Sequence, residues 1–187
     1  GTPGFLQAIK SALSVKLKEE MGVEAMAARE EQLRERMFSG LLSIPNLKIL
    51  AEGIRQRLPI FSFYIDNVHY NLIVRLLNDR YGIQMRGGCS CAGTYGHFLL
   101  HVDPATSREI TDKIDHGDLS SKPGWVRASL HPTTTDEEVD RILEAIREIG
   151  RSHAVWAKDY EYSPSTNEFR HHGVAPENDK MRAWFTL

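Results

Sequence analysis

Two hydrophobic periodicities alternate along this chain, and their order constrains its fold more than any other feature. Apolar residues spaced three and four apart predict helices over residues 5–20, 26–37, 72–81, 104–114 and 135–149. Short apolar runs, several of them aromatic or β-branched, predict strands over residues 47–51, 60–65, 83–86 and 125–130. This order predicts an α/β protein, more closely an α+β two-layer fold, in which helices cover a short mixed or antiparallel sheet.

Capping residues predict where several of these helices begin and end. Asp66 or Asn67 is the expected N-cap of the third helix, and Gly82 has the residue type preferred at its C′ position. Thr135 and Glu138 form the pattern of a capping box, which predicts the start of the last helix. Gly150 is its expected end.

The chain beyond this helix has weaker periodicity. An edge strand is expected over 155–162, and the polar tail from 163 to 180 is expected to be partly irregular. We therefore divide the chain into a linking helix over 1–24, a small α/β domain over 25–150 and a C-terminal extension over 151–187.

Composition indicates a protein with a substantial core and excludes several classes of partner. Of the 187 residues, 41% are hydrophobic, which is enough to bury a core. A net charge of -2 without a basic cluster argues against nucleic-acid binding. The lack of a long apolar run or a signal-peptide pattern argues against a membrane protein and favours the cytoplasm. The two cysteines, one residue apart, are too close for an unstrained disulfide.

The stretch from Met85 to His97 is where we expect chemistry. It holds both cysteines, an arginine and four of the 14 glycines, so its backbone can approach a ligand closely. A thiol among small residues and near a guanidinium is a candidate nucleophile, because only the thiolate attacks and nearby positive charge favours it. Cys91 is this candidate, and the alternative is an inert small residue in a tight glycine turn.

Four residues in and after this stretch allow a second interpretation as a zinc site. They are Cys89, Cys91, His97 and His101. One residue between the cysteines is fewer than the usual two to four, and zinc needs four converging donors. The spacing therefore disfavours a metal site, and we expect no metal.

Three stretches resemble signatures of the class V aminotransferase group of fold-type I pyridoxal-phosphate (PLP) enzymes, particularly cysteine desulfurases and selenocysteine lyases. They are Gly-Thr-Pro at 1–3, Met-Arg-Gly-Gly-Cys-Ser-Cys-Ala at 85–92, and Val-Arg-Ala-Ser-Leu at 126–130 with Thr-Asp-Glu-Glu-Val-Asp-Arg at 135–141. The match spans roughly residues 1–150 in the family's order. It implies the small C-terminal domain of such an enzyme, whose first helix joins the two domains.

The resemblance implies a role for four residues. Cys91 corresponds to the cysteine that attacks the sulfur of the substrate and carries it as a persulfide. Arg127 corresponds to the arginine that binds the substrate α-carboxylate, a task that suits a planar guanidinium. Arg86 corresponds to a second active-site arginine, and Thr2 to a threonine that reaches the cofactor phosphate of the neighbouring subunit. An alternative for Arg127 is a simple ion pair with an acid such as Asp136.

The chain departs from the family pattern at three places. None of its eight lysines stands in the context of the family's Schiff-base lysine, so PLP is expected in the full-length enzyme and not on this fragment. Cys89 stands where desulfurases often carry a histidine, so either sulfur is a candidate for the reactive one. The segment from Thr94 to Trp125 is longer than expected, which would change access to the site or the substrate.

These observations imply part of a PLP-dependent cysteine desulfurase that transfers sulfur from L-cysteine. The expected partners are an amino-acid substrate, a second copy of the enzyme in a homodimer, and a sulfur-acceptor protein, with no nucleic acid and no membrane. The fragment alone is expected to be inactive, because the PLP lysine is missing. Two alternatives stay open: another class V aminotransferase or lyase without persulfide chemistry, and a non-catalytic dimerising or zinc-binding module.

Overall fold

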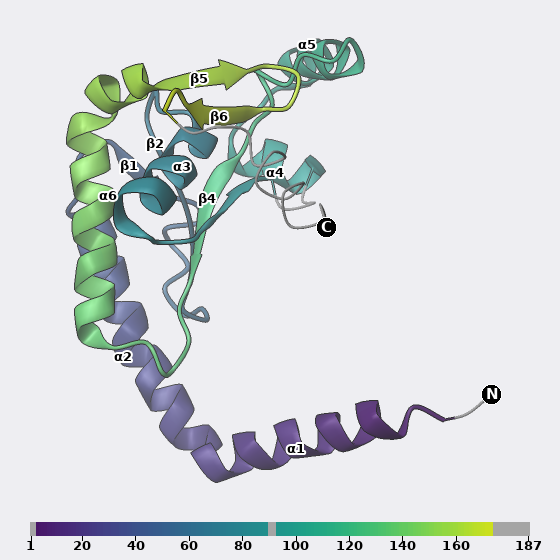
Figure 1. Ribbon diagram of the computed structural model, residues 1–187, viewed down its shortest axis with the longest axis vertical. Coiled ribbons are helices and arrows are strands. Elements are labelled where there is room, and N and C mark those ends of the chain that lie inside the picture. The colour runs from purple at the N-terminus through teal and green to yellow at the C-terminus, as the bar shows by residue number, and fades with distance from the viewer. Residues whose placement is uncertain (1–2, 90–92, 174–187) are drawn as a thin grey trace, which may run out of the picture.

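The computed structural model describes residues 3–89 and 93–173. Its α-helices are α1 Phe5–Met21, α2 Val23–Leu42, α3 Tyr70–Tyr81, α4 Gly93–Leu99, α5 Pro104–Asp115 and α6 Asp136–Trp156, followed by the short 3₁₀ helix η1 Ala157–Asp159. Its strands are β1 Leu47–Ile49, β2 Ile60–Ile65, β3 Arg86–Gly88, β4 Trp125–Ser129, β5 Tyr160–Ser163 and β6 Glu168–His171. Figure 1 shows α1 extending away from the body that the other elements form.

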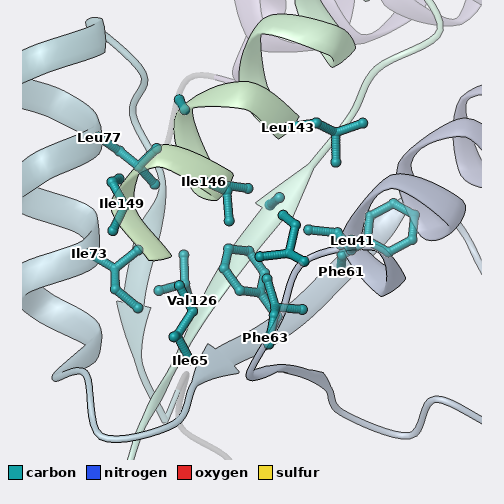
Figure 2. Close-up of a cluster of buried hydrophobic side chains, with 14 of the residues drawn as sticks. Leu41, Phe61, Phe63, Ile65, Ile73, Leu77, Val126, Leu143, Ile146 and Ile149 are labelled. Atoms are coloured by element: carbon teal, nitrogen blue, oxygen red, sulfur yellow. The ribbon is translucent and has the colours of Figure 1, made fainter. Parts of the chain in front are cut away.

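The main sheet is antiparallel throughout, with strand order β1-β2-β4-β3. Alternate residues of β2 and β4 are buried on one face, as the twofold periodicity of a strand requires. Figure 2 shows this face packing against three helices through Leu41, Phe61, Phe63, Ile65, Ile73, Leu77, Val126, Leu143, Ile146 and Ile149. Helices α2, α3 and α6 therefore cover one side of the sheet, which confirms the predicted α/β class and its antiparallel, two-layer form.

The predicted caps are confirmed at two helix ends and wrong at two, the start of α3 and the end of α6. The Thr135 hydroxyl accepts from the Glu138 amide and the Glu138 carboxylate from the Thr135 amide, so the capping box forms. Gly82 closes α3 with a left-handed φ of 65°. The N-cap of α3 is His69, whose Nδ1 accepts from Asn71, and neither Asp66 nor Asn67 takes this place. Both belong to the preceding turn, where Asn67 has a φ of 62°.

The third strand of the sheet lies later in the sequence than its apolar residues indicated. The prediction placed it over 83–86, but β3 runs from Arg86 to Gly88. The Ile83 amide still donates to the Leu77 carbonyl, so this residue completes the end of α3. Glycine is needed at position 87 of this strand because α3 packs close to it. A Cβ there would lie only 2.6 Å from Asn71 Oδ1.

The last helix and the segment after it also differ from the prediction. Gly150 does not end α6, which continues to Trp156. Ile149 is fully buried and Trp156 packs against the core, so tertiary contacts on both sides of Gly150 hold the helix. Of the edge strand expected over 155–162, only 160–162 form a strand: they belong to β5, which pairs with β6 in a separate two-stranded sheet, while 155–159 are helical. The expected irregular region therefore contains β6.

The helix α1 has no buried residue. The apolar residues of its predicted face are each more than half exposed: Phe5, Leu6, Ile9, Leu13 and Leu17. In the described ranges, no helix has the length and apolarity that a membrane span requires.

Candidate functional site

The pairing of β3 with β4 brings two predicted site residues together. Arg86 and Arg127, 41 positions apart in the sequence, are direct partners in this register. Their neighbours Gly87 and Val126 also pair, and Val126 is fully buried toward the core. Directly opposite residues share a face of the sheet, so both arginines lie on the face away from the core helices.

The arginine pair has no neutralising partner among the described residues, since no ion pair there involves either side chain. The alternative partner Asp136 binds Arg29 at 2.8 Å and Arg36 at 3.2 Å instead. Like charges placed directly opposite on a sheet repel each other, so an anion bound by both would stabilise the pair. Two guanidinium groups side by side suit a carboxylate, which accepts parallel charge-assisted hydrogen bonds.

The cysteine stretch follows β3 directly. Gly88 pairs with Trp125 and has a φ of 111°, a conformation that other residues rarely adopt, and it turns the chain out of the strand. Cys89 comes next as a free, half-buried thiol. Cys91 and Thr2 lie outside the described residues, so their predicted roles stay predictions.

A cavity of about 180 Å³ lies beside Cys89. Its walls come from α4, from α5 and from the segment that leads into β4, so residues 93–125 build most of it. His97 Nδ1 lies 3.1 Å from the Ser107 hydroxyl and links the two helices. Trp125 forms another part of the wall, two residues before Arg127 on the same strand.

The zinc interpretation gains no support from the structure. Among residues 3–89 and 93–173, no group of three or more possible ligands converges on one point. Cys89 and His97 both line the cavity, whereas His101 does not, and Cys91 lies outside the described residues.

The main sheet does not by itself provide the lysine of a PLP site. PLP chemistry of this family needs a lysine near the substrate, and the main sheet offers only Lys48. Lys48 lies on β1, two strands away from the β4 strand of Arg127. Adjacent strands are about 4.8 Å apart, so this lysine is roughly 10 Å from the arginine strand. The arginine pair fits a carboxylate and the sheet itself contributes no lysine beside it, whereas Lys122 lies in the segment before β4 and lines the cavity.

A buried polar group behind β3 was missed by the sequence reasoning. Asn167, at the tip of the β5–β6 hairpin, donates to the Tyr70 hydroxyl at 2.7 Å and accepts from Tyr162 at 2.9 Å. The Asn71 side chain donates to the Asn167 carbonyl. Burial raises the pKa of Tyr70, so its hydroxyl stays protonated at neutral pH. This group fixes the start of α3 against Gly87 and supports the strand that carries Arg86.

Comparison with known proteins identifies the family and agrees with the fold. The family model "Aminotransferase class-V" matches residues 1–142, and the chain belongs to this family, whose members use PLP. It is 28% identical over 148 residues to a probable cysteine desulfurase of Halobacterium salinarum, covering 79% of this chain and 30% of that protein. A cysteine desulfurase of Haloferax volcanii is 27% identical over 146 residues, covering 78% of this chain and 29% of that protein.

A solved structure shows the same fold. The apo cysteine desulfurase of Thermococcus onnurineus aligns with a TM-score of 0.59 and 22% identity, over 81% of this chain and 32% of that one. The chain thus spans about 30% of the length of the curated relatives described above. This agrees with the expectation of a cysteine desulfurase-like fragment of a class V PLP enzyme.

Proposed function

We propose that this chain is part of a PLP-dependent cysteine desulfurase, in which Arg127 and Arg86 bind the α-carboxylate of L-cysteine. The observation that carries the proposal is the direct pairing of the two arginines on the sheet face opposite the core helices. Family membership and the desulfurase relatives support the reaction class. PLP, attached to a lysine outside this chain, would supply the electron sink for the chemistry at the substrate.

The task of the cysteine stretch in this proposal is to accept sulfur. The Cys91 thiolate attacks the substrate sulfur, so that a sulfur–sulfur bond forms and the substrate carbon–sulfur bond breaks. The electron pair of the broken bond stays on the substrate carbon, which takes up a proton to give alanine. Cys91 is left as a persulfide. The further partners we propose are a second copy of the enzyme and a protein that accepts this sulfur.

Substitution of Arg127 in the intact enzyme tests the carboxylate role. A charge-assisted hydrogen bond to a carboxylate contributes about 1.5–3 kcal/mol, so Arg127→Ala should lower kcat/KM for L-cysteine about tenfold to hundredfold. Arg127→Lys keeps the charge and should restore only part of this loss. Arg141→Ala, on the exposed side of α6, is the matched control. Unchanged kcat/KM in Arg127→Ala would contradict the assignment.

A different class V reaction is the alternative if the enzyme makes no sulfide. In an aminotransferase or a lyase without persulfide chemistry, Arg127 would keep its carboxylate role and both cysteines would be incidental. Conversion of an amino acid without release of sulfide, and without sensitivity to Cys91→Ser, would favour that alternative.

A further inference from the structure

The position of β3 depends on contacts that its own pairing does not supply. This strand has only three residues, lies at the edge of the main sheet and pairs there with β4. Two of the three residues are glycines, and a Gly-rich strand specifies its register weakly because it has few side chains to pack. The middle residue, Gly87, packs directly against the start of α3. The placement of Arg86 therefore depends on how firmly this helix start is held.

The ring of Tyr70 fills the space behind this end of the sheet. An added Cβ at Gly87 would lie 3.2 Å from the ring, and one at Gly124 would lie 2.6 Å from it. Gly87 belongs to β3 and Gly124 comes directly before β4, so one side chain contacts β3 and the residue that leads into β4. Arg86 and Arg127 lie on the opposite face of the same two strands. The Tyr70 ring therefore supports the arginine pair from the core side of the sheet.

Asn167, at the tip of the β5–β6 hairpin, holds this ring in place. It is only 7% exposed, and its side-chain amide donates to the Tyr70 hydroxyl at 2.7 Å and accepts from the Tyr162 hydroxyl at 2.9 Å. Its backbone carbonyl accepts from the side chain of Asn71, which also faces Gly87. Buried hydrogen bonds are costly to break, because each group left without a partner has lost its hydration. One residue of the hairpin thus fixes two residues of α3 that contact β3.

The hairpin that carries Asn167 lies beyond the part of the chain that matches the family model. The match ends at residue 142, whereas β5 begins at Tyr160. The hairpin is also joined to the segment before β4, since the Leu119 amide donates to the Pro164 carbonyl at 2.9 Å. It therefore contacts both α3, which packs on β3, and the segment that leads into β4.

We infer that Asn167 is a positioning residue for the carboxylate site, which it holds in place through Tyr70 and Asn71. Its hydrogen bonds fix the start of α3, and this keeps β3 in the register that sets Arg86 opposite Arg127. Asn167 bonds to α3 on the core side of the sheet, so it does not touch the substrate. The inference rests on the proposed function, because the arginine pair is the group that Asn167 positions.

Substitution of Asn167 in the intact enzyme tests this role. Asn167→Gly removes the amide side chain but suits the left-handed φ of 59° at this position, so the hairpin turn can persist. If β3 then spends less time in the binding register, the apparent affinity for the carboxylate falls by the same factor. We expect KM for L-cysteine to rise about three- to tenfold while kcat changes less than about twofold. A mere loss of folded enzyme would instead lower kcat and leave KM unchanged.

Cysteamine distinguishes the carboxylate site from the rest of the active site. This amine has the thiol of L-cysteine but no α-carboxylate, so its inhibition constant should change less than about twofold in Asn167→Gly. The matched control is Asn46→Gly, because Asn46 has a similar φ of 61° but is exposed and precedes β1, at the opposite edge of the sheet. An unchanged KM for L-cysteine in Asn167→Gly, or an equal weakening of cysteamine, would overturn the inference.

Two further variants separate this inference from the proposed function. Tyr70→Phe removes the hydroxyl that Asn167 binds, so it should also raise KM, and the double variant should raise KM by less than the product of the two single effects. Tyr70→Phe decides if Asn167→Gly fails to fold by circular dichroism. A raised KM in Arg127→Ala with a normal KM in both other variants would overturn the inference alone. A normal kcat/KM in Arg127→Ala would overturn the proposed function and the inference together.

Discussion

Arg86 and Arg127 show how the proposed binding site would oppose the stability of the fold that holds it. Two guanidinium groups paired across adjacent strands repel each other unless an anion lies between them. The sheet tolerates this repulsion because its core face is tightly packed. Their proximity comes from the register of β3 with β4, which burial of Val126 helps to fix.

Removal of one charge from this pair should therefore stabilise the chain in the absence of ligand. Arg86 is the exposed member, so Arg86→Gln removes charge with little loss of packing. We expect the free energy of unfolding in urea to rise by about 0.2–1 kcal/mol at low salt, with a smaller gain at high salt because the repulsion is screened. Arg141→Gln is the control and should change little. A loss of stability in Arg86→Gln would show that the pair does not repel.

Substitution of Gly87 tests how closely α3 packs against β3. An added Cβ would lie 2.6 Å from Asn71 Oδ1 and 3.2 Å from both Tyr70 and Val74, so Gly87→Ala should destabilise the chain by about 1–3 kcal/mol. Gly53→Ala is the matched control, because nothing lies within 4 Å of its added Cβ. We expect the melting temperature to fall for Gly87→Ala alone. Equal melting of the two variants would mean that α3 moves away easily.

At the scale of elements, the most informative contact is the one between the C-terminal hairpin and α3. His69 caps α3 through Nδ1 and packs against the rings of Tyr70, Tyr162 and Phe169. Burial lowers the pKa of this imidazole below its usual value of 6.5. Protonation would also place a donor where the helix needs an acceptor, beside the positive end of the helix dipole.

This geometry predicts a loss of stability in weak acid. The unfolded chain protonates His69 as pH falls through 6.5, while the folded chain resists protonation, so the unfolded state binds more protons. The contribution of His69 is complete above pH 6.5 and is lost as pH falls toward the lower folded pKa. Urea unfolding at pH 7.5 and 5.5 should show a drop that His69→Asn, which keeps a good cap, reduces and that His116→Asn leaves intact. An equal loss of unfolding free energy in His69→Asn would contradict this role of His69.

Local sequence patterns were sufficient to predict most helices and strands. They did not predict the elements whose bounds depend on contacts between residues far apart in the sequence. The aromatic strand at 60–65 and the Thr135 capping box carry their own periodicity and hydrogen bonds, and both form as predicted. Gly150 has low helix propensity, yet packing of Ile149 carries α6 past it. The hairpin is fixed by Asn167 bonding to Tyr70, 97 positions away, and local periodicity does not report such a contact.

The sequence also predicted only part of the candidate site. Arg86 and Arg127 were each identified from a separate motif. The register of β3 with β4 places them directly opposite each other. The lining residues Trp125 and Lys122 were not identified, because a cavity between two helices depends on how α4 and α5 pack. Cys91 and Thr2 lie outside the described residues, so their roles stay predictions.

At the scale of the whole molecule, the proposed function needs residues that the described part of this chain does not contribute. It covers about 30% of the length of its desulfurase relatives, and its sheet offers arginines for a carboxylate but no lysine beside them. The exposed apolar residues of α1 fit a helix that joins this part to another. We therefore expect no desulfurase turnover from this chain with added PLP.

The central claim is tested most directly by the two cysteines of the intact enzyme. With L-cysteine and PLP, we expect the wild type to release sulfide and alanine in the presence of a thiol reductant. Cys91→Ser should abolish both products, and Cys89→Ser should keep most of the turnover, because the proposed function assigns the persulfide to Cys91. A wild type that makes no sulfide, or two cysteine variants that both behave like it, would contradict the desulfurase account.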